Sequence, residues 1–311
     1  MSAPHLVWLP FGAEDLGDVP DGLRIETFRA GEPPESVARV EFFVPTYDTG
    51  LDLSRLLPRM RSLRVVQTQT AGVDNVEPHM PPGVTLCNAR GVHDASTAEL
   101  AVALVLASLR GIPDFARAQE QGRWRHERRP ALADRSVLIV GYGSIGAALE
   151  RRLTGFECEI VRVARRPRDG VHEWQDLPDL LGHADVVVLM VPLDDSTRGL
   201  VDAGFLARMK DGALLVNVAR GAVVDTGALV AECASGRLMA AVDVTDPEPL
   251  PPEHPLWRTP GVLVSPHVGG ATSAMKPRVT RLVAAQLARF VAGEPLVNVV
   301  GGPRTLRRDP S

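Results

Sequence analysis

Three polar segments of this 311-residue chain carry side chains that could hold an acid and move a proton. Arg220, in the first segment, can grip a carboxylate through two parallel hydrogen bonds. His267, in the third, can donate a proton near neutral pH, and a carboxylate such as Glu248 beside it would favour the charged imidazolium. Each segment follows an apolar run, and the pairs are Ala213–Val218 with Asn217–Gly221, Ala240–Val244 with Asp243–Pro249, and Val262–Ser265 with Ser265–Gly270.

Each of these residues also has an ordinary structural interpretation. A lone His267 is more often a structural or surface histidine, and the chain has eight histidines in all. Arg220 alone would fit a surface ion pair, and Glu248 between two prolines would fit an exposed loop. Their succession after consecutive late strands favours a shared site, because open α/β folds bind ligands at the carboxyl ends of their strands.

A glycine-rich turn precedes these segments. Gly141-Tyr-Gly143-Ser-Ile-Gly146 follows the apolar run Val137–Val140 and opens a helical stretch, so it has G-x-G-x-x-G spacing in a strand-turn-helix context. Gly141 would permit the tight turn, Gly143 would let backbone approach a pyrophosphate, and Gly146 would let the helix pack on the strand. We therefore predict a dinucleotide site; the alternative is a glycine turn without a ligand.

The residues after the next strand favour NADP(H) over NAD(H). An NAD site normally places Asp or Glu at the end of its second strand. Here the run Ile160–Val163 is followed by Ala-Arg165-Arg166-Pro-Arg168, with no carboxylate at that position. The guanidinium groups of Arg165 and Arg166 suit a 2′-phosphate, although a solvated basic loop would accept NAD(H) and NADP(H) equally.

The elements that must position these residues form an α/β pattern. From Arg135 onward, strand-length runs that are apolar on both faces alternate with helical segments such as Ala203–Lys210 and Gly227–Ser235. Such a pattern predicts a doubly wound parallel sheet covered by helices on both faces. The first ninety residues alternate as well and predict a smaller α/β unit, with strand candidates Leu6–Leu9, Val40–Val44 and Val65–Gln67.

Two longer helices are expected outside that alternation. The first runs from about Ala95 to Leu109, where Ser96 and Glu99 have the spacing of a capping box and Gly111 with Pro113 ends the helix. Because it is apolar on nearly every face, we expect it to be buried. The second, about 273–291, follows the last strand and could return the chain to the first unit.

Composition bounds the class of protein. With 45% hydrophobic and 23% charged residues, the chain fits a globular enzyme of two domains. A net charge of -4 gives no general reason to bind nucleic acid or a membrane surface. The three cysteines are far apart and lack metal-ligand spacing, so we expect no metal site, and their sparse, odd number fits the cytoplasm. The start of the chain lacks the pattern of a signal peptide.

The motifs together resemble one family. GYGSIG, NVARG, DVTDPEP and SPHVGGAT, in this order, are similar to the D-isomer-specific 2-hydroxyacid dehydrogenases, and the ARRPR segment resembles their NADP-using glyoxylate/hydroxypyruvate reductases. The resemblance extends over nearly the whole chain. It implies hydride transfer between NADPH and a small 2-oxo acid, giving the D-2-hydroxy acid.

The resemblance also implies a role for each site residue. Arg220 would bind and orient the substrate, Glu248 would pair with His267, and His267 would be the proton donor. Backbone amides of the loop containing Ala71, Gly72 and Val73 would receive the substrate carboxylate, with Gln69, Thr70 and Trp257 lining the pocket. Asp243 would contact the nicotinamide carboxamide, and the cofactor-binding set would comprise Gly141, Gly143, Ser144, Ile145, Gly146, Arg165, Arg166, Pro192, Ala219, Asp243 and Gly269.

Family architecture further implies a Rossmann cofactor domain, residues 93–272, inserted into a flavodoxin-like substrate domain made of residues 1–92 and 273–311. A homodimer would form through the segment around 94–130. Two alternatives remain at this point. One is a nucleotide-sensing, corepressor-like interaction protein on the same fold, which could retain the Arg–Glu–His set. The other is a formate dehydrogenase, which Glu248 beside the histidine disfavours.

Overall fold

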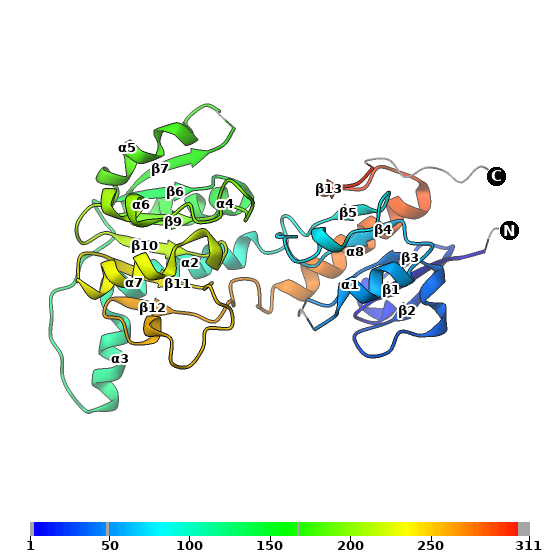
Figure 1. The fold of residues 1–311 in the computed structure, drawn as a ribbon, viewed down its shortest axis with the longest axis horizontal. Coiled ribbons are helices and arrows are strands. Elements are labelled where there is room, and N and C mark those ends of the chain that lie inside the picture. The colour runs from blue at the N-terminus through cyan, green and yellow to red at the C-terminus, as the bar shows by residue number, and fades with distance from the viewer. Residues whose placement is uncertain (1–2, 48–49, 167, 304–311) are drawn as a thin grey trace. The chain divides into compact units, whose positions relative to one another are not determined.

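The computed structural model describes residues 3–47, 50–166 and 168–303 (Figure 1). The remaining positions, which include both chain ends of the expected substrate domain and the proline of the ARRPR segment, lie outside the described residues. The chain divides into two compact units. Unit 1 comprises Met1–His93 with Ser273–Ser311, and unit 2 comprises Asp94–Thr272.

The sheet of unit 1 has the strand order β13-β5-β4-β3-β1-β2. All its pairings are parallel except that of β13 with β5, which is antiparallel. The five parallel strands follow the order 2-1-3-4-5, which is the flavodoxin-like form of a doubly wound sheet. The strands are β1 (His5–Leu9), β2 (Leu23–Thr27), β3 (Val40–Phe43), β4 (Val65–Gln67), β5 (Thr85–Cys87) and β13 (Val299–Gly301).

The described part of unit 1 contains two α-helices, α1 (Leu53–Leu56) and α8 (Met275–Ala292). The buried face of α8 packs against β1, β3 and β4, so the end of the chain completes the core that its beginning starts. Its buried residues in that core are Val279, Val283, Leu287 and Phe290, which lie at helical spacing on one face.

The sheet of unit 2 is parallel throughout, with the order β12-β11-β10-β9-β6-β7-β8. The strand order therefore reverses between β6 and β9, and such a switch point is where doubly wound sheets bind ligands. The expected doubly wound fold is confirmed in both units. The strands are β6 (Ser136–Val140), β7 (Glu159–Ala164), β8 (His172–Glu173), β9 (Val186–Leu189), β10 (Leu214–Asn217), β11 (Met239–Val242) and β12 (Val262–Val264).

Alternate residues of the central strands enter two different cores in unit 2. Leu138 of β6 packs with one core, whereas Val137 and Ile139 pack with the other. Both faces of the sheet are therefore buried, which is why the strands are apolar without interruption. One core receives α5 (Leu177–Leu180), α6 (Ala203–Arg208) and α7 (Thr226–Ala234), and the other receives α2 (Asp94–Arg110) and α4 (Ser144–Leu153).

The structure differs from the sequence prediction at the start of α2. The helix begins at Asp94, so Ser96 is already inside it and does not cap it. The Ser96 hydroxyl instead bonds the hydroxyl of Thr272 at 2.8 Å, which explains why a residue typical of caps lies here. Gly111 ends α2 in the left-handed region, as expected, and a further helix, α3 (Ile112–Glu120), begins directly after it.

In Figure 1, α3 and the segment after it project away from the sheet of unit 2. Across the ranges that the structure describes, no single helix is long and apolar enough to cross a membrane, although α2 and α3 pass that test together as a pair bent by 66°.

Candidate active site

His267 and Glu248 form a hydrogen-bonded pair in unit 2. Nδ1 of His267 lies 2.5 Å from a carboxylate oxygen of Glu248, and the two side chains are 42% and 41% exposed. Among the described residues, Nε2 of the same ring has no hydrogen-bond partner. The carboxylate thus holds the ring through one nitrogen and leaves the other to exchange a proton with a ligand.

Asp243 fixes the loop that carries His267. Its buried carboxylate accepts bonds from the Ser265 hydroxyl at 2.5 Å and from the N–H groups of Val268 and Gly269, both at 2.9 Å. Its carbonyl oxygen accepts the N–H of His267 at 2.7 Å. His267 has a φ of 52°, a left-handed conformation that is uncommon outside glycine. Such a residue persists only where its surroundings over-determine it, which is typical of functional loops.

A tight turn after β10 presents Arg220. The buried Asn217 side chain donates to the Arg220 carbonyl at 2.9 Å and accepts the N–H of Ala219 at 3.0 Å, so it holds both ends of the turn. Nη1 of Arg220 donates to the Ala219 carbonyl at 2.8 Å. A Cβ on Gly221 would lie 1.9 Å from the carbonyl oxygen of Thr245, so glycine lets this turn lie against the segment after β11. Because β10, β11 and β12 are parallel neighbours, all three polar segments lie at the carboxyl-terminal end of the sheet.

The glycines between β6 and α4 have three different surroundings. Gly141 has a φ of 100°, and a Cβ there would lie 2.6 Å from the Met190 carbonyl carbon, so the turn at the switch point requires glycine. At Gly146 a Cβ would lie 2.9 Å from the Gly141 carbonyl oxygen and 3.3 Å from the Ile139 side chain. At Gly143 a Cβ would meet nothing within 4 Å, so protein packing does not explain this glycine. The approach of a ligand to the N-terminus of α4 does explain it.

The remaining residues expected at the cofactor lie around the same sheet edge. Ser144 and Ile145 are the first residues of α4, and the Ser144 hydroxyl donates to Asp94 at 3.2 Å. The carbonyl of Pro192 accepts the Thr197 hydroxyl at 2.6 Å in the loop after β9. Ala219 and Gly269 are buried within the Arg220 turn and the His267 loop, respectively.

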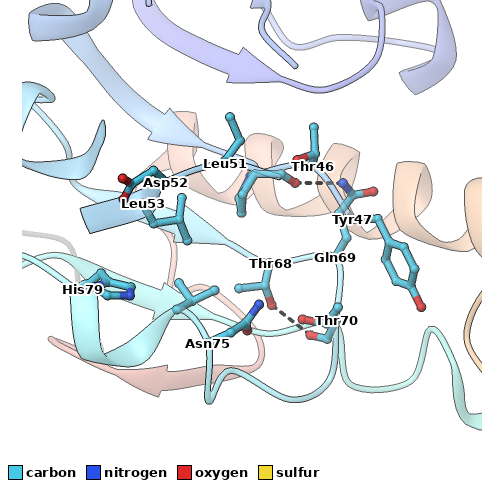
Figure 2. A pocket seen from close by; sticks show the side chains of 12 residues that line it. Thr46, Tyr47, Leu51, Asp52, Leu53, Thr68, Gln69, Thr70, Asn75 and His79 are labelled. Atoms are coloured by element: carbon cyan, nitrogen blue, oxygen red, sulfur yellow. Dashed lines mark hydrogen bonds between the residues drawn. The ribbon is translucent and has the colours of Figure 1, made fainter. Parts of the chain in front are cut away.

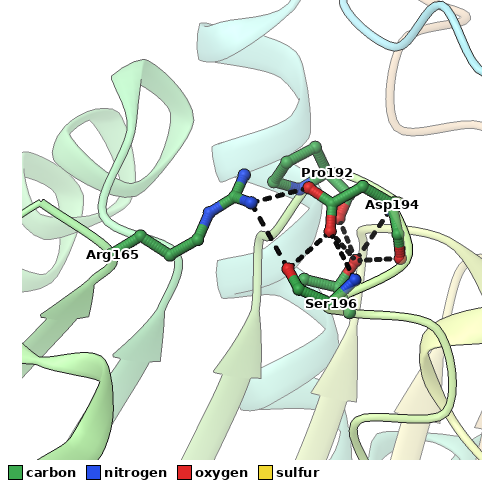
Figure 3. Close-up of polar contacts among 5 residues, drawn as sticks. Arg165, Pro192, Asp194 and Ser196 are labelled. Atoms are coloured by element: carbon green, nitrogen blue, oxygen red, sulfur yellow. Dashed lines mark hydrogen bonds and ion pairs between the residues drawn. The ribbon is translucent and has the colours of Figure 1, made fainter.

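Arg165, at the end of β7, is already paired (Figure 3). Its Nη1 donates to a carboxylate oxygen of Asp194 at 2.7 Å and to the Ser196 hydroxyl at 3.3 Å. Arg166 is exposed and donates to no acceptor among the described residues. One of the two guanidinium groups expected at a 2′-phosphate is therefore held by a carboxylate of the loop after β9.

Tyr142 anchors the basic segment to the glycine-rich turn. Its carbonyl accepts a bond from Arg168, whose guanidinium lies 5.0 Å from the centre of the Tyr142 ring. Its hydroxyl donates to Glu150 of α4, which also accepts Nε of Arg162 at 2.7 Å. The bond from Arg162 is the main reason why the pKa of Glu150 lies below its ordinary value. Because of the bond to Glu150, the pKa of Tyr142 is raised.

In unit 1, side chains hold the carbonyl groups of the loop after β4. Five consecutive carbonyl oxygens, those of residues 68–72, each accept a bond from a side chain at 2.6–2.9 Å. Figure 2 shows the bond from the Thr68 hydroxyl to the Thr70 carbonyl. The donors to residues 68–72 are, in order, Gln67 Nε2, His93 Nε2, Thr68 Oγ1, Asn88 Nδ2 and Thr70 Oγ1.

The N–H groups of Ala71, Gly72 and Val73 take no part in that network. None of the three donates to an acceptor within the part of the chain that the structure describes. Successive backbone N–H groups without a protein acceptor can bind an anion, so this loop is a candidate site for a carboxylate. Beside this loop lies a cavity of about 200 Å³ (Figure 2), which Gln69 and Thr70 line as expected together with Thr46, Tyr47, Asn75 and His79. Trp257 belongs to unit 2, where its Nε1 donates to the Pro251 carbonyl at 2.9 Å.

Comparison with known proteins decides the family. Residues 102–269, more than half of the chain, match the D-isomer specific 2-hydroxyacid dehydrogenase, NAD binding domain. The chain belongs to this family. It is therefore an enzyme of the NAD(P)-dependent D-2-hydroxyacid dehydrogenases, and the glycine-rich turn of unit 2 lies in its NAD(P)-binding domain.

Individual dehydrogenases of the family resemble the chain over most of its length. A D-3-phosphoglycerate dehydrogenase of Archaeoglobus fulgidus is 30% identical over 91% of this chain, which spans 56% of that enzyme. A glyoxylate reductase/hydroxypyruvate reductase of Homo sapiens is 32% identical over 76% of each chain. Among solved structures, an NADPH-dependent glyoxylate/hydroxypyruvate reductase of Sinorhizobium meliloti in complex with NADP and malonate has a TM-score of 0.83 and 26% identity, covering 99% of this chain and 100% of that chain.

The residues of this dehydrogenase fit a dinucleotide and give no sign of a metal. The unexplained glycine at 143 lies at the N-terminus of α4, where N–H groups and the helix dipole favour a pyrophosphate. In the described part of the chain, no group of three or more His, Cys, Asp or Glu side chains could hold a metal ion.

Several residues that position the site did not stand out in the sequence. Asn217 and Ser265 lie inside the motifs, where their polarity was a signal without an assigned partner, and Asp194 lies outside them in the loop after β9. Asn88 and His93 lie outside every motif, and their bonds to the unit 1 loop join residues 17 and 24 positions apart. Contacts of that kind depend on the strand order, which local spacing does not reveal.

Proposed function

We propose that this dehydrogenase uses NADPH to reduce a small 2-oxo acid of the glyoxylate or hydroxypyruvate type to the D-2-hydroxy acid. The contact of 2.5 Å between His267 Nδ1 and Glu248 is the observation that carries the proposal. A ring held through Nδ1 in this way leaves Nε2 to act as the proton donor, and the adjacent carboxylate orients the ring.

The other residues of the chain supply binding and orientation. The Arg220 guanidinium provides a fork for the acid, and the N–H groups of Ala71, Gly72 and Val73 provide an uncharged donor set for its carboxylate. NADPH, when bound, supplies the hydride for the carbonyl carbon. Gly143 and the start of α4 would hold its pyrophosphate, with Arg166 and Arg165 near the 2′-phosphate.

The relatives support the cofactor and the substrate class. The Sinorhizobium meliloti enzyme is NADPH-dependent and holds NADP with malonate, a small dicarboxylic acid. The human relative acts on glyoxylate and hydroxypyruvate, by its name. At about 30% identity we infer the class of substrate from them, and a screen of glyoxylate, hydroxypyruvate and phenylpyruvate with both cofactors measures the substrate itself.

The proton-donor role of His267 is tested by its removal. His267→Ala should lower turnover by roughly two to four orders of magnitude, since general acid catalysis contributes about that much. The dissociation constant for NADPH should stay nearly unchanged, because the glycine-rich turn and the basic segment, which would hold the phosphates, lie outside the His267 loop. Steady-state kinetics and fluorescence titration measure the two effects. His172→Ala, an exposed histidine of the same unit, is the control. Turnover within tenfold of the parent in His267→Ala would refute the assignment.

We also propose a homodimer through the segment around 94–130, and residence in the cytoplasm, which three free thiols suit. Trp124 is 95% exposed beside a hollow of about 440 Å³ that it lines with Phe115. Arg129 bonds Asp114 at 2.9 Å and thereby ties the segment after α3 back to that helix. An exposed aromatic side chain on a segment that is held in place is typical of an anchor residue at a protein interface.

The dimer is tested by sedimentation. The parent protein should sediment as a dimer at micromolar concentration, and Trp124→Ala should shift the equilibrium toward monomer by at least about tenfold, since aromatic anchors contribute 2 kcal/mol or more. Trp257→Ala, which removes a tryptophan outside the segment 94–130, is the matched control. A parent protein that is monomeric at these concentrations would contradict the proposal.

A further inference from the structure

The loop after β9 brings a carboxylate to the place where the second strand lacks one. Asp194 lies 29 positions from Arg165 in the sequence, and its Oδ2 accepts the Arg165 Nη1 at 2.7 Å (Figure 3). The two side chains are 37% and 50% exposed, so solvent and ligands can reach both. No comparable carboxylate contacts Arg166 among the described residues.

Asp194 is held in place by its own loop. Its Oδ1 accepts the N–H of Ser196 at 3.0 Å, the Ser196 hydroxyl at 2.6 Å and the Thr197 hydroxyl at 3.4 Å. Thr197 is buried and donates in turn to the Pro192 carbonyl at 2.6 Å. The bond from Ser196 is the largest reason why the pKa of Asp194 lies below its ordinary value, so the carboxylate is charged at neutral pH. The flexible partner of the pair is therefore the arginine.

We propose that Asp194 is a specificity-determining residue that holds Arg165 when no 2′-phosphate is present and thereby limits the preference for NADPH over NADH. The inference rests on the proposed use of Arg165 and Arg166 for the 2′-phosphate. A phosphate that recruits Arg165 must break the bond to Oδ2 and approach a fixed negative charge. NADH has no 2′-phosphate, so its binding neither breaks the bond between Arg165 and Asp194 nor brings a phosphate close to the Asp194 carboxylate.

The magnitude follows from exposure. A half-exposed ion pair is weak in water, and the repulsion between a 2′-phosphate and a nearby carboxylate is of similar size. Salt reduces the second effect. Removing the charge of Asp194 should therefore lower the dissociation constant of NADPH by about three- to tenfold, since 1.4 kcal/mol corresponds to tenfold. The constant for NADH should change by less than about twofold.

The experiment compares binding in three variants of the full-length protein by titration calorimetry, with NADPH and NADH in parallel. Asp194→Asn keeps an oxygen for Ser196 and replaces the oxygen that faces Arg165. Asp195→Asn removes the same charge one residue further on, at an exposed side chain without a partner among the described residues, and should leave both constants within about twofold. Arg165→Ala should weaken NADPH binding by about tenfold or more, as expected for a charge-assisted bond.

The outcomes separate the inference from the proposed function. Tighter NADPH binding in Asp194→Asn alone supports the inference. If this variant binds NADPH unchanged or more weakly while Arg165→Ala loses affinity, the inference is overturned and the cofactor preference stands. If Asp194→Asn weakens NADH instead, the carboxylate binds the ribose directly and the inference is overturned. If Arg165→Ala leaves NADPH binding unchanged, the role of Arg165 in the proposed function fails, and the inference fails with it.

Discussion

Two loops of the molecule expose backbone N–H groups, and they do so by different means. In unit 2 the turn between β6 and α4 uses glycines and the N-terminus of a helix. In unit 1 the loop after β4 has no helix behind it. There side chains hold five consecutive carbonyls, and the N–H groups of residues 71–73 donate to no acceptor among the described residues.

The difference shows what each kind of anion site requires. The unit 2 turn depends on small residues at fixed local spacing, because backbone must approach both a neighbouring strand and a pyrophosphate. The unit 1 loop depends on polar side chains that come from three separate segments, 67–70, Asn88 and His93. The unit 2 site is therefore defined by six consecutive residues, whereas the unit 1 site forms only when the sheet brings distant segments together.

The largest effect that tests this comparison is expected at the glycine-rich turn. Gly143→Ala should raise the dissociation constant of NADPH by about tenfold or more, because a Cβ there would meet the ligand and nothing in the protein. The free energy of unfolding should change by less than about 0.5 kcal/mol, as it does for most surface substitutions. Fluorescence titration and calorimetry measure the two quantities.

Gly141→Ala is the matched control for that variant. Its φ of 100° and the approach of 2.6 Å to Met190 predict a loss of stability of about 2 kcal/mol or more together with the loss of binding. Equal destabilisation by the two substitutions would show that both glycines serve the fold, and would remove the main physical reason for assigning Gly143 to a cofactor.

The same contrast explains how much the sequence could predict. The doubly wound class followed from runs such as Val137–Val140, since a strand buried on both faces has no polar alternation. The resemblance predicted the contact between His267 and Glu248. Because the three polar segments follow consecutive apolar runs, they were expected at the carboxyl ends of neighbouring strands. The positive φ of His267 and the bonds from Asp243 were not expected, because spacing says nothing about which side chain turns back on its own loop.

Other elements escaped because their sequences are short or unusual for their conformation. β5 and β13 were not predicted, because each has three residues and a neighbouring glycine or proline, such as Gly83 before β5 and Pro303 after β13, that is typical of turns. The start of α2 was expected at about Ala95 and lies at Asp94, but the predicted capping role of Ser96 is wrong, because the serine bonds Thr272 instead. The pairing of Arg165 with Asp194 was missed because it joins the ends of two strands that β6 separates in the sheet.

A smaller effect is expected from the unit 1 loop. Asn88→Ala should raise the KM for the 2-oxo acid by about tenfold, because a freed Ala71 carbonyl can rotate outward and spoil the donor set. The kcat and the NADPH dissociation constant should remain within about twofold, since Asn88 belongs to unit 1, whereas the His267 loop and the glycine-rich turn belong to unit 2. Steady-state kinetics at saturating NADPH measure the split. A fall in kcat at constant KM would place Asn88 in the chemistry and contradict a role in carboxylate binding.

The smallest effect concerns charge, which supports the unit 2 turn far more than the unit 1 loop. Glu150 binds Arg162 and the Tyr142 hydroxyl, and its pKa is depressed in the folded state from an ordinary 4.5, mainly by Arg162. A depressed carboxyl pKa contributes stability above the unfolded value and loses it as pH falls through the folded value. Glu150→Gln should therefore reduce the free energy of unfolding by about 1 kcal/mol at pH 7, because the partner Arg162 is 30% exposed, and by progressively less as the pH falls below 4.5.

Urea unfolding of the parent and the variant across this pH range measures that difference. Glu159→Gln, an exposed carboxyl on β7 with no ion pair among the described residues, is the control and should follow the parent at every pH. A deficit in Glu150→Gln that is the same at pH 3 and pH 7 would mean that the glutamate acts through packing. The glycine-rich turn would then be insensitive to acid. In this respect it would resemble the unit 1 loop, whose carbonyls are held mainly by neutral amides and hydroxyls.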